Sequence, residues 1–211
     1  MDLMIHRKRV KTYINVNISK GDSMIKKWSV SNEKLVVQTP IFSLSEMEAK
    51  SPLDERKSGK FVYLDVPSWV NVIALTPEKE VVLIKQYRHG NRQVTVEIPG
   101  GMCDKKEGKK GFVEEDFISA GLRELREETG YVGTEVKLIG VVEPNPAFQN
   151  NFCGTILVEN VRQTQDQDLD SHEEIIVYTR PLSDIPEMIR TRQITHSLVV
   201  AAFHHLSLLQ T

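Results

Sequence analysis

The sequence predicts an α/β fold in which helices pack on both sides of a mixed sheet, preceded by a small β-rich arm. Three observations predict this class. Strand-like runs rich in β-branched residues follow one another over residues 35–99, a helix is expected over residues 114–129, and further strand-like runs precede two C-terminal helices. This mixture of strands and helices is typical of a sheet covered on both faces.

Each element is bounded by local signals. The strands expected before the helix span residues 35–38, 61–66, 70–75, 81–86 and 94–98, and turn residues such as Thr76-Pro77-Glu78 separate them. The helix should stop at Gly130, the residue type that most easily adopts the left-handed conformation past a last turn. Strands at 136–142, 155–158 and 175–178 follow, and a short helix near 184–189 and an apolar-striped helix over 194–209 close the chain.

The composition indicates an ordinary globular protein. Of 211 residues, 40% are hydrophobic and 27% charged, with a formal net charge of -2, so nothing favours a nucleic-acid or membrane partner. No run of about 18 apolar residues is present, and Cys103 and Cys153 lack the spacing of a zinc site or a disulfide framework. We therefore expect a cytoplasmic protein with a flexible tail over 1–24, a β-rich arm over 25–66 and the main domain over 67–211.

The most informative segment is rich in carboxylates. Glu124, Glu127 and Glu128 share one face of the expected helix, because positions i, i+3 and i+4 lie together. Like charges at this spacing repel, and a hard divalent cation would reverse that effect. Mg²⁺ prefers oxygen ligands and is often completed by substrate phosphates, which indicates phosphoryl or pyrophosphate chemistry. The alternative is a solvated acidic helix face.

The segment Arg123-Glu124-Leu125-Arg126-Glu127-Glu128-Thr129-Gly130-Tyr131 resembles the second half of the Nudix box at every fixed position. The first half departs from the pattern. Gly101 is followed at the family's spacing by Glu107, but fifteen residues rather than seven separate Glu107 from Arg123. This indicates an eight-residue insertion, around 108–115, which we expect to reshape the sugar side of the pocket.

The resemblance implies an α/β/α sandwich and a metal site. Glu124, Glu127 and Glu128 would bind Mg²⁺, with Mn²⁺ as a possible substitute, and the Gly100 carbonyl would complete the ligand set. Gly101, Arg123 and Gly130 would frame the box. Either Glu107 or Glu115 could brace Arg123, and we favour Glu115 because it already lies on the helix.

Substrate residues are implied by a further likeness to the ADP-ribose pyrophosphatase branch, which covers most of the chain from Trp28. Pro146 stands where that branch carries a proline beyond the box, and Arg88 matches an arginine that contacts the diphosphate or ribose. Glu97 would position the ribose or hold Arg88, with a structural ion pair as the equal alternative. Trp28 would stack on the nucleobase in a homodimer whose arm reaches the partner's site, although ordinary packing in the core or at an interface is the alternative for this side chain.

The resemblance also places a general base on an acidic loop over 166–174. Glu173 matches best by position, with Glu174 and Asp170 as competitors, and Glu127 joins Glu173 in the catalytic set. The expected reaction is Mg²⁺-dependent cleavage of a nucleoside diphosphate sugar, ADP-ribose first, into a nucleoside monophosphate and a sugar phosphate. The alternatives are GDP-mannose, CoA or a dNTP as substrate, or a sensor that binds ADP-ribose without cleaving it.

Overall fold

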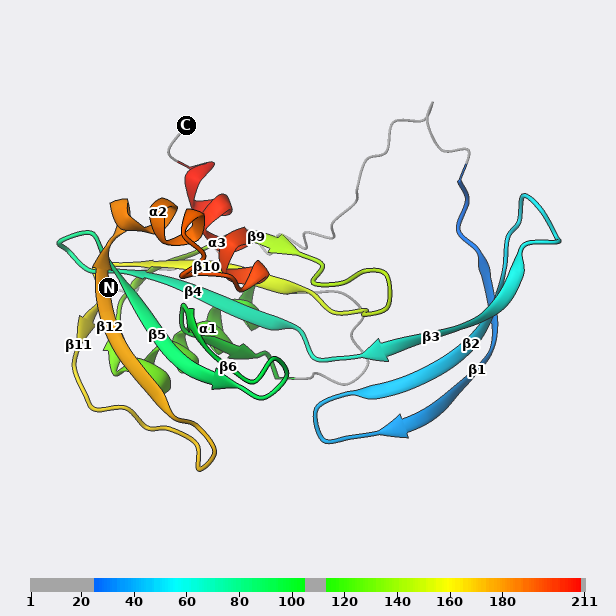
Figure 1. Cartoon of the computed structure of the whole chain (residues 1–211), viewed down its shortest axis with the longest axis horizontal. Coiled ribbons are helices and arrows are strands. Elements are labelled where there is room, and N and C mark those ends of the chain that lie inside the picture. Colours follow the sequence, from blue (N-terminus) through cyan, green and yellow to red (C-terminus); the bar gives the residue numbers. More distant parts are fainter. Residues whose placement is uncertain (1–24, 105–112, 210–211) are drawn as a thin grey trace, which may run out of the picture.

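The computed structural model describes residues 25–104 and 113–209, which form a main body and an arm that extends from it (Figure 1). The elements are β1 (Ser29–Gln38), β2 (Ser43–Lys50), β3 (Ser58–Asp65), β4 (Trp69–Leu75), β5 (Glu80–Arg88), β6 (Gln93–Glu97), β7 (Gly100–Met102), α1 (Glu114–Thr129), β8 (Tyr131–Val132), β9 (Glu135–Val142), β10 (Cys153–Glu159), β11 (Arg162–Gln163), β12 (Ile175–Pro181), the 3-10 turn η1 (Leu182–Asp184), α2 (Ile185–Arg190) and α3 (Ser197–Ser207).

The sheet of the main body is mixed. Its strands run in the order β12-β5-β4-β10-β9, with β6 paired to β5 and β7 paired to β4. Only the β4–β10 pairing is parallel among the described strands of this sheet, with Trp69 beside Cys153 and Leu75 beside Glu159. Because β4 lies between β7 and β10, it connects the loop before α1 to the centre of the sheet.

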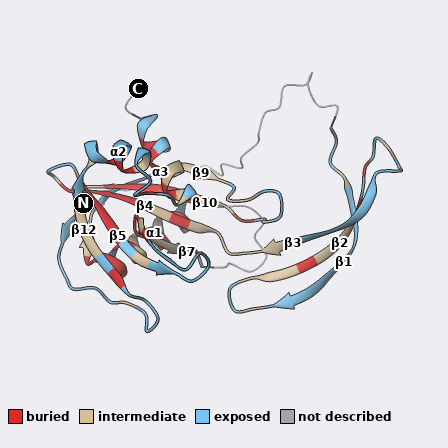
Figure 2. Ribbon diagram, viewed as in Figure 1, coloured by how far each residue is buried: buried red, intermediate tan, exposed pale blue. Residues whose placement is uncertain are grey.

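Helices cover both faces of this sheet, which confirms the predicted α/β/α layering. Alternate side chains of a strand point to opposite faces, so β4 sends Val72 toward α1 and Ile73 toward α2 and α3. Figure 2 shows the buried positions concentrated where the sheet meets the helices. The two hydrophobic clusters on either side make the sheet a rigid base for the residues at its edge.

Local signals explain the limits of α1. Glu114, Glu115 and Asp116 occupy its first turn, where the partial positive charge of a helix N-terminus stabilises acidic side chains. Gly130 follows the last turn with φ 72° and donates its N–H to the Arg126 carbonyl. The predicted helix therefore has the observed bounds, whereas the insertion preceding it falls largely within residues 105–112, outside the described residues.

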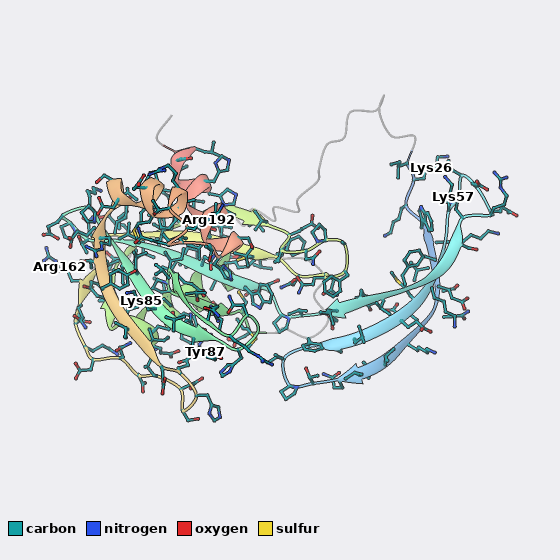
Figure 3. All side chains as sticks on the ribbon, in the orientation of Figure 1. Lys26, Lys57, Lys85, Tyr87, Arg162 and Arg192 are labelled. Carbon is teal, nitrogen blue, oxygen red and sulfur yellow. The ribbon has the colours of Figure 1, made fainter. Side chains whose placement is uncertain are left out.

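The arm is a separate antiparallel sheet in the order β1-β2-β3. Every residue of β1 is exposed, and the exposed apolar side chains of the arm include Leu35, Val36 and Phe61. Lys26 and Lys57 lie in the arm, well away from Lys85 and Tyr87 of β5 in the main body (Figure 3). The arm thus presents a sheet with no covering layer among the described residues.

Both cysteines are free thiols in the core. Burial raises the pKa of Cys103 and of Cys153 to about 12, so neither provides an accessible thiolate near neutral pH. None of the described helices is both long enough and apolar enough to cross a bilayer.

Candidate active site

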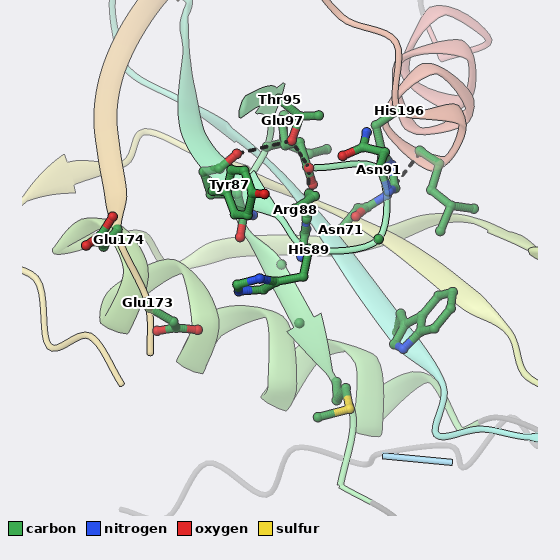
Figure 4. A pocket seen from close by; sticks show the side chains of 18 of the residues that line it. Asn71, Tyr87, Arg88, His89, Asn91, Thr95, Glu97, Glu173, Glu174 and His196 are labelled. Carbon is green, nitrogen blue, oxygen red and sulfur yellow. Dashed lines mark hydrogen bonds and ion pairs between the residues drawn. The ribbon is translucent and has the colours of Figure 1, made fainter. Parts of the chain in front are cut away.

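A cavity of about 1080 Å³ opens at the edge of the main sheet, beside the glycine turn that leads into β7. Its walls come from segments far apart in the sequence, namely the ends of β4 and β5, strand β6, the loop before β12 and the start of α3. Figure 4 shows Arg88, Glu97 and Glu173 around this cavity. Five of the predicted site residues therefore line one cavity, namely Arg88, Glu97, Gly100, Gly101 and Glu173.

The carboxylates of α1 lie beside the glycine turn. The Glu128 side chain is buried and accepts a hydrogen bond from the Gly100 N–H at 2.9 Å. Burial raises the pKa of Glu128 to about 8; the Gly100 N–H opposes this shift, whereas the charges of Glu124 and Glu173 add to it. Glu124 is also mostly buried, and burial raises its pKa. The site therefore holds more negative charge than its surroundings stabilise.

Arg123 is the cation nearest to these carboxylates. Its guanidinium lies 2.9 Å from a Glu124 oxygen and 3.1 Å from a Glu127 oxygen, and it donates to the Met102 carbonyl. Glu115, favoured as its brace, is exposed and lies eight residues earlier, about 12 Å along the helix axis. Among the described residues, no hydrogen bond or ion pair joins Glu115 to Arg123. Glu107, the other candidate, lies outside them.

The glycines allow a close approach between the turn and the helix. A Cβ at Gly101 would lie 2.4 Å from the Glu124 carboxylate, and one at Gly100 would lie 2.2 Å from the Val70 carbonyl oxygen. Gly130 has a positive φ, and a Cβ at this position would lie 2.0 Å from the Gln165 carbonyl oxygen. At Gly100 and Gly130 a side chain would collide with backbone, whereas at Gly101 it would displace the Glu124 carboxylate.

The acidic loop before β12 is attached to the end of α1. The Asp168 N–H donates to the Glu127 carbonyl at 2.8 Å, and Gln167 donates its side-chain amide to the carbonyls of Glu128 and Ile175. These bonds place Glu173 at the cavity wall, where its charge acts on both Glu124 and Glu128. Gln167 was not among the predicted site residues, because nothing in a loop sequence indicates which helix carbonyls a side-chain amide will reach.

Arg88 and Glu97 form a bidentate ion pair, with N–O distances of 2.8 and 2.6 Å. Thr95 donates a further hydrogen bond to Glu97 at 2.6 Å. Burial alone would raise the pKa of Glu97, but the bonds from Arg88 and Thr95 outweigh it and lower the pKa below its ordinary value. Glu97 is only 3% exposed and Arg88 is 44% exposed, so the pair presents its cation to the cavity.

Two predicted substrate residues lie elsewhere in the chain. Trp28 packs edge-on against Phe61 in the arm, with ring centroids 5.9 Å apart. Pro146 lines a second cavity of about 900 Å³ between the arm and the main body. Neither residue lines the first cavity, so a single chain does not bring them to Arg88 and Glu173.

The donor set fits a hard divalent cation. Three carboxylates stand at i, i+3 and i+4 beside the Gly100 turn, and all donors are oxygens. Burial, with a smaller contribution from the charges of Glu124 and Glu173, raises the pKa of Glu128, and a bound cation would oppose this shift. Within residues 25–104 and 113–209, no three His, Cys, Asp or Glu side chains converge closely enough to coordinate an ion. Glu124 and Glu127 are instead turned toward Arg123, so these side chains would reorient on binding.

His196 also lines this cavity, although no motif in the sequence pointed to it. It lies directly before α3 and lines the wall on the far side of Arg88 from Glu173 (Figure 4). Asn71 of β4 supports this wall by donating its side-chain amide to the Leu198 carbonyl at 3.0 Å. Only the packing of α3 against β4 brings these residues together, and no local sequence signal indicates it.

Comparisons with known proteins agree with this geometry. Residues 67–198 match the family described as NUDIX domain. The chain is 27% identical over 180 residues to the ADP-ribose pyrophosphatase of Bacillus subtilis (strain 168), covering 83% of this chain and 93% of the relative. It is 29% identical over 143 residues to the methanol dehydrogenase activator of Bacillus methanolicus, covering 67% and 73%.

A solved structure described as a crystal structure of an ADP compounds hydrolase superposes with a TM-score of 0.70 at 15% sequence identity. The match covers 88% of this chain and 95% of the other. At this identity the likeness establishes a shared fold, including the placement of helices on both faces of the sheet.

Proposed function

This chain belongs to the Nudix family of hydrolases, and we propose that it hydrolyses the diphosphate bridge of nucleoside diphosphate sugars with Mg²⁺, ADP-ribose being the first-choice substrate. The products would be a nucleoside monophosphate and a sugar phosphate. The observation that carries this proposal is the set of carboxylates on α1, which lies beside the Gly100 turn and within the electrostatic range of Glu173. The likeness to a bacterial ADP-ribose pyrophosphatase supports the choice of substrate.

The cation would be held by Glu124, Glu127 and Glu128, with the carbonyl of Gly100. When bound, it supplies charge neutralisation at the phosphate oxygens and makes water a better nucleophile. The Gly100 N–H keeps the buried Glu128 side chain in place at the turn. Arg123 balances part of the charge of Glu124 and Glu127.

Glu173 is our choice of general base. It is exposed at the cavity wall, its charge acts on Glu124 and Glu128, and the hydrogen bonds of Gln167 and Asp168 hold its loop against α1. A carboxylate in this place could orient and deprotonate a water that attacks phosphorus. Arg88 would bind the second phosphate, because Glu97 fixes the direction of its guanidinium and leaves its exposed side toward the cavity.

A substrate panel tests the proposal. ADP-ribose, GDP-mannose, UDP-glucose, CoA and a dNTP would each be incubated with Mg²⁺ or Mn²⁺, and the products separated by chromatography. We expect one or more sugar conjugates to give a nucleoside monophosphate and a sugar phosphate. Cleavage of CoA or the dNTP alone would contradict the substrate class, and tight binding of ADP-ribose without products would favour a sensor.

Replacing Gly101 with Ala tests the role of the turn separately from the fold. The new methyl group would meet the end of the flexible Glu124 side chain, so we expect a Tm close to wild type but hydrolysis lowered at least about tenfold as this ligand is displaced. Gly100→Ala is the matched variant. Its methyl group would meet the backbone at Val70, so it should destabilise the fold by about 1–3 kcal/mol. Wild-type activity in Gly101→Ala would argue against Glu124 as a ligand.

The arm is proposed to form a homodimer and to carry Trp28 to the partner's site. Its exposed apolar side chains, including Leu35 and Val36, and the separation of Trp28 from the first cavity support this proposal. Light scattering during size exclusion should give the mass of two chains, and Val36→Glu should shift it toward one. Ser31→Glu, at another exposed position of β1, is the control. A monomeric wild type would overturn the proposal.

A further inference from the structure

The residues at the start of α3 line the cavity but take no part in the proposed reaction. We propose that His196 is a specificity-determining residue, whose imidazole donates a hydrogen bond to a hydroxyl oxygen of the sugar attached to the phosphate that Arg88 binds. The inference rests on the proposed function. It extends that function from the diphosphate bridge to the group beyond it, and it adds a residue from a part of the chain outside the box.

The backbone holds His196 in a fixed position. It precedes the first turn of α3 in an extended conformation, and its carbonyl accepts the N–H groups of Val199 and Val200. The next turn is tied to the sheet by the hydrogen bond from Asn71 to the Leu198 carbonyl. Because Asn71 pairs with Gly100 across β4 and β7, the position of His196 is fixed relative to the proposed metal turn.

The ring of His196 has an unused hydrogen-bonding group. Its Nδ1 is buried and has no hydrogen-bond partner among the described residues, while the residue as a whole is only half-buried and lines the cavity. Burial lowers the pKa of His196; the charge of Glu97 opposes this shift and that of Arg88 adds to it. A neutral imidazole carries one N–H, and leaving a bare nitrogen buried avoids an unpaired buried donor. The N–H is then on Nε2, and the proposal directs this atom toward the cavity that His196 lines.

The order of charges along the cavity indicates what this N–H would meet. Arg88 interacts electrostatically with Glu128, Glu173 and His196. In Figure 4, Arg88 correspondingly stands between Glu173 and His196. If the attacked phosphate lies at the carboxylates and the second phosphate at Arg88, the next group of the substrate reaches His196. In a nucleoside diphosphate sugar, that group is a hydroxyl-bearing ring.

Two rings of such a substrate carry the same chemistry, the ribose of the nucleoside and the distal sugar. A hydroxyl on either ring can accept from Nε2. The phosphate that is attacked decides which ring lies beyond Arg88, so the two sources are distinguished by removing a hydroxyl from one ring at a time. ADP-ribose analogues lacking one hydroxyl on the adenosine ribose, or one on the distal ribose, provide these two arms.

The test compares His196→Phe and His196→Asn with wild type. Phe keeps an aromatic ring without a hydrogen-bonding group, and Asn keeps a polar group near the position of Nδ1 but has none near Nε2, so both variants lose the proposed donor. His204→Phe, at an exposed position of α3 outside the cavity, is the matched control. We expect His196→Phe to raise the KM for ADP-ribose about five- to tenfold, the effect of one neutral hydrogen bond, with kcat within about twofold of wild type.

The deoxy analogues separate a specific contact from a general loss of structure. The analogue that lacks the hydroxyl contacted by His196 should have a higher KM than ADP-ribose with the wild-type enzyme. His196→Phe should not raise the KM of this analogue any further. For the other ring, the variant should raise the KM of the analogue as much as that of ADP-ribose. Equal effects of His196→Phe on every substrate, or a fall in kcat with unchanged KM, would overturn the inference. If His196→Phe does not fold, His196→Asn provides the same comparison.

Calorimetric binding of ADP-ribose, measured beside turnover, keeps the two proposals distinct. If wild type binds ADP-ribose but does not cleave it, hydrolysis is overturned, and the Kd values of the variants still test the His196 contact. If wild type neither binds nor cleaves a diphosphate sugar, both proposals fail. If wild type cleaves ADP-ribose and His196→Phe leaves both KM and Kd unchanged, the His196 contact alone is wrong.

Discussion

Glu127→Gln should lower kcat/KM for the preferred diphosphate sugar by about 10²–10³-fold or more while leaving the protein folded. The substitution keeps the shape of the side chain but removes one anionic ligand from the proposed cation site, and a charge-stabilising group of this kind contributes on that scale. The fold should tolerate the change. The observed contacts of Glu127 are with Arg123 and Arg126 near the surface, where ion pairs contribute little to stability.

Steady-state kinetics at increasing Mg²⁺ concentration would measure this effect, together with a thermal melt of each protein. Glu114→Gln is the control, because it removes the same charge from an exposed position in the first turn of α1. It should match wild type. Full activity of Glu127→Gln at limiting Mg²⁺ would exclude Glu127 from the metal site.

Arg88→Met should lower the free energy of unfolding by about 2 kcal/mol at pH 7 and also raise the KM. The substitution removes two hydrogen bonds from Glu97, which is 3% exposed and would keep only Thr95 as a partner. Breaking a fully buried pair costs about 3–5 kcal/mol, and the 44% exposure of Arg88 reduces that range. Urea unfolding would measure the loss. The Arg88→Met/Glu97→Gln double variant should recover part of it, because no buried charge is left unpaired.

The same pair predicts a direction for the pH dependence. In wild type the folded-state pKa of Glu97 lies below its ordinary value of 4.5, so its stabilising effect is fully present above that value. The effect disappears as the pH falls through the lowered pKa of the folded state. The difference in stability between wild type and Arg88→Met should therefore be largest near pH 7 and shrink toward pH 3. A difference independent of pH would show that the loss comes from packing.

The parts of this protein that could be predicted are those set by local sequence. The bounds of α1 follow from the acidic first turn and Gly130, and the buried strands from their β-branched runs. Glu97 was expected to hold Arg88, to position the ribose or to form a purely structural ion pair, and it contacts Arg88 at 2.6 and 2.8 Å. Each of these features could be predicted because the residues that determine it lie close together in the sequence.

The remaining features depend on contacts between distant segments. Strand β2, with the sequence Ser-Leu-Ser-Glu-Met-Glu-Ala-Lys, lacks β-branched residues and forms because β1 and β3 pair with it on both sides. His196 reaches the cavity through the packing of α3, 125 positions after Asn71 in the chain. The site roles of Trp28 and Pro146 likewise remain predictions, because their contribution requires a second chain or a different substrate pose.

The most direct test of the central claim is cleavage of ADP-ribose in H₂¹⁸O with Mg²⁺, followed by mass spectrometry of both products. Water attack on the diphosphate bridge predicts one ¹⁸O atom in either the nucleoside monophosphate or the sugar phosphate, and Glu127→Gln should show little product in the same time. The labelled product also identifies the phosphorus that is attacked. Absence of ¹⁸O from both phosphates, or no cleavage by wild type, would contradict diphosphate hydrolysis at this site.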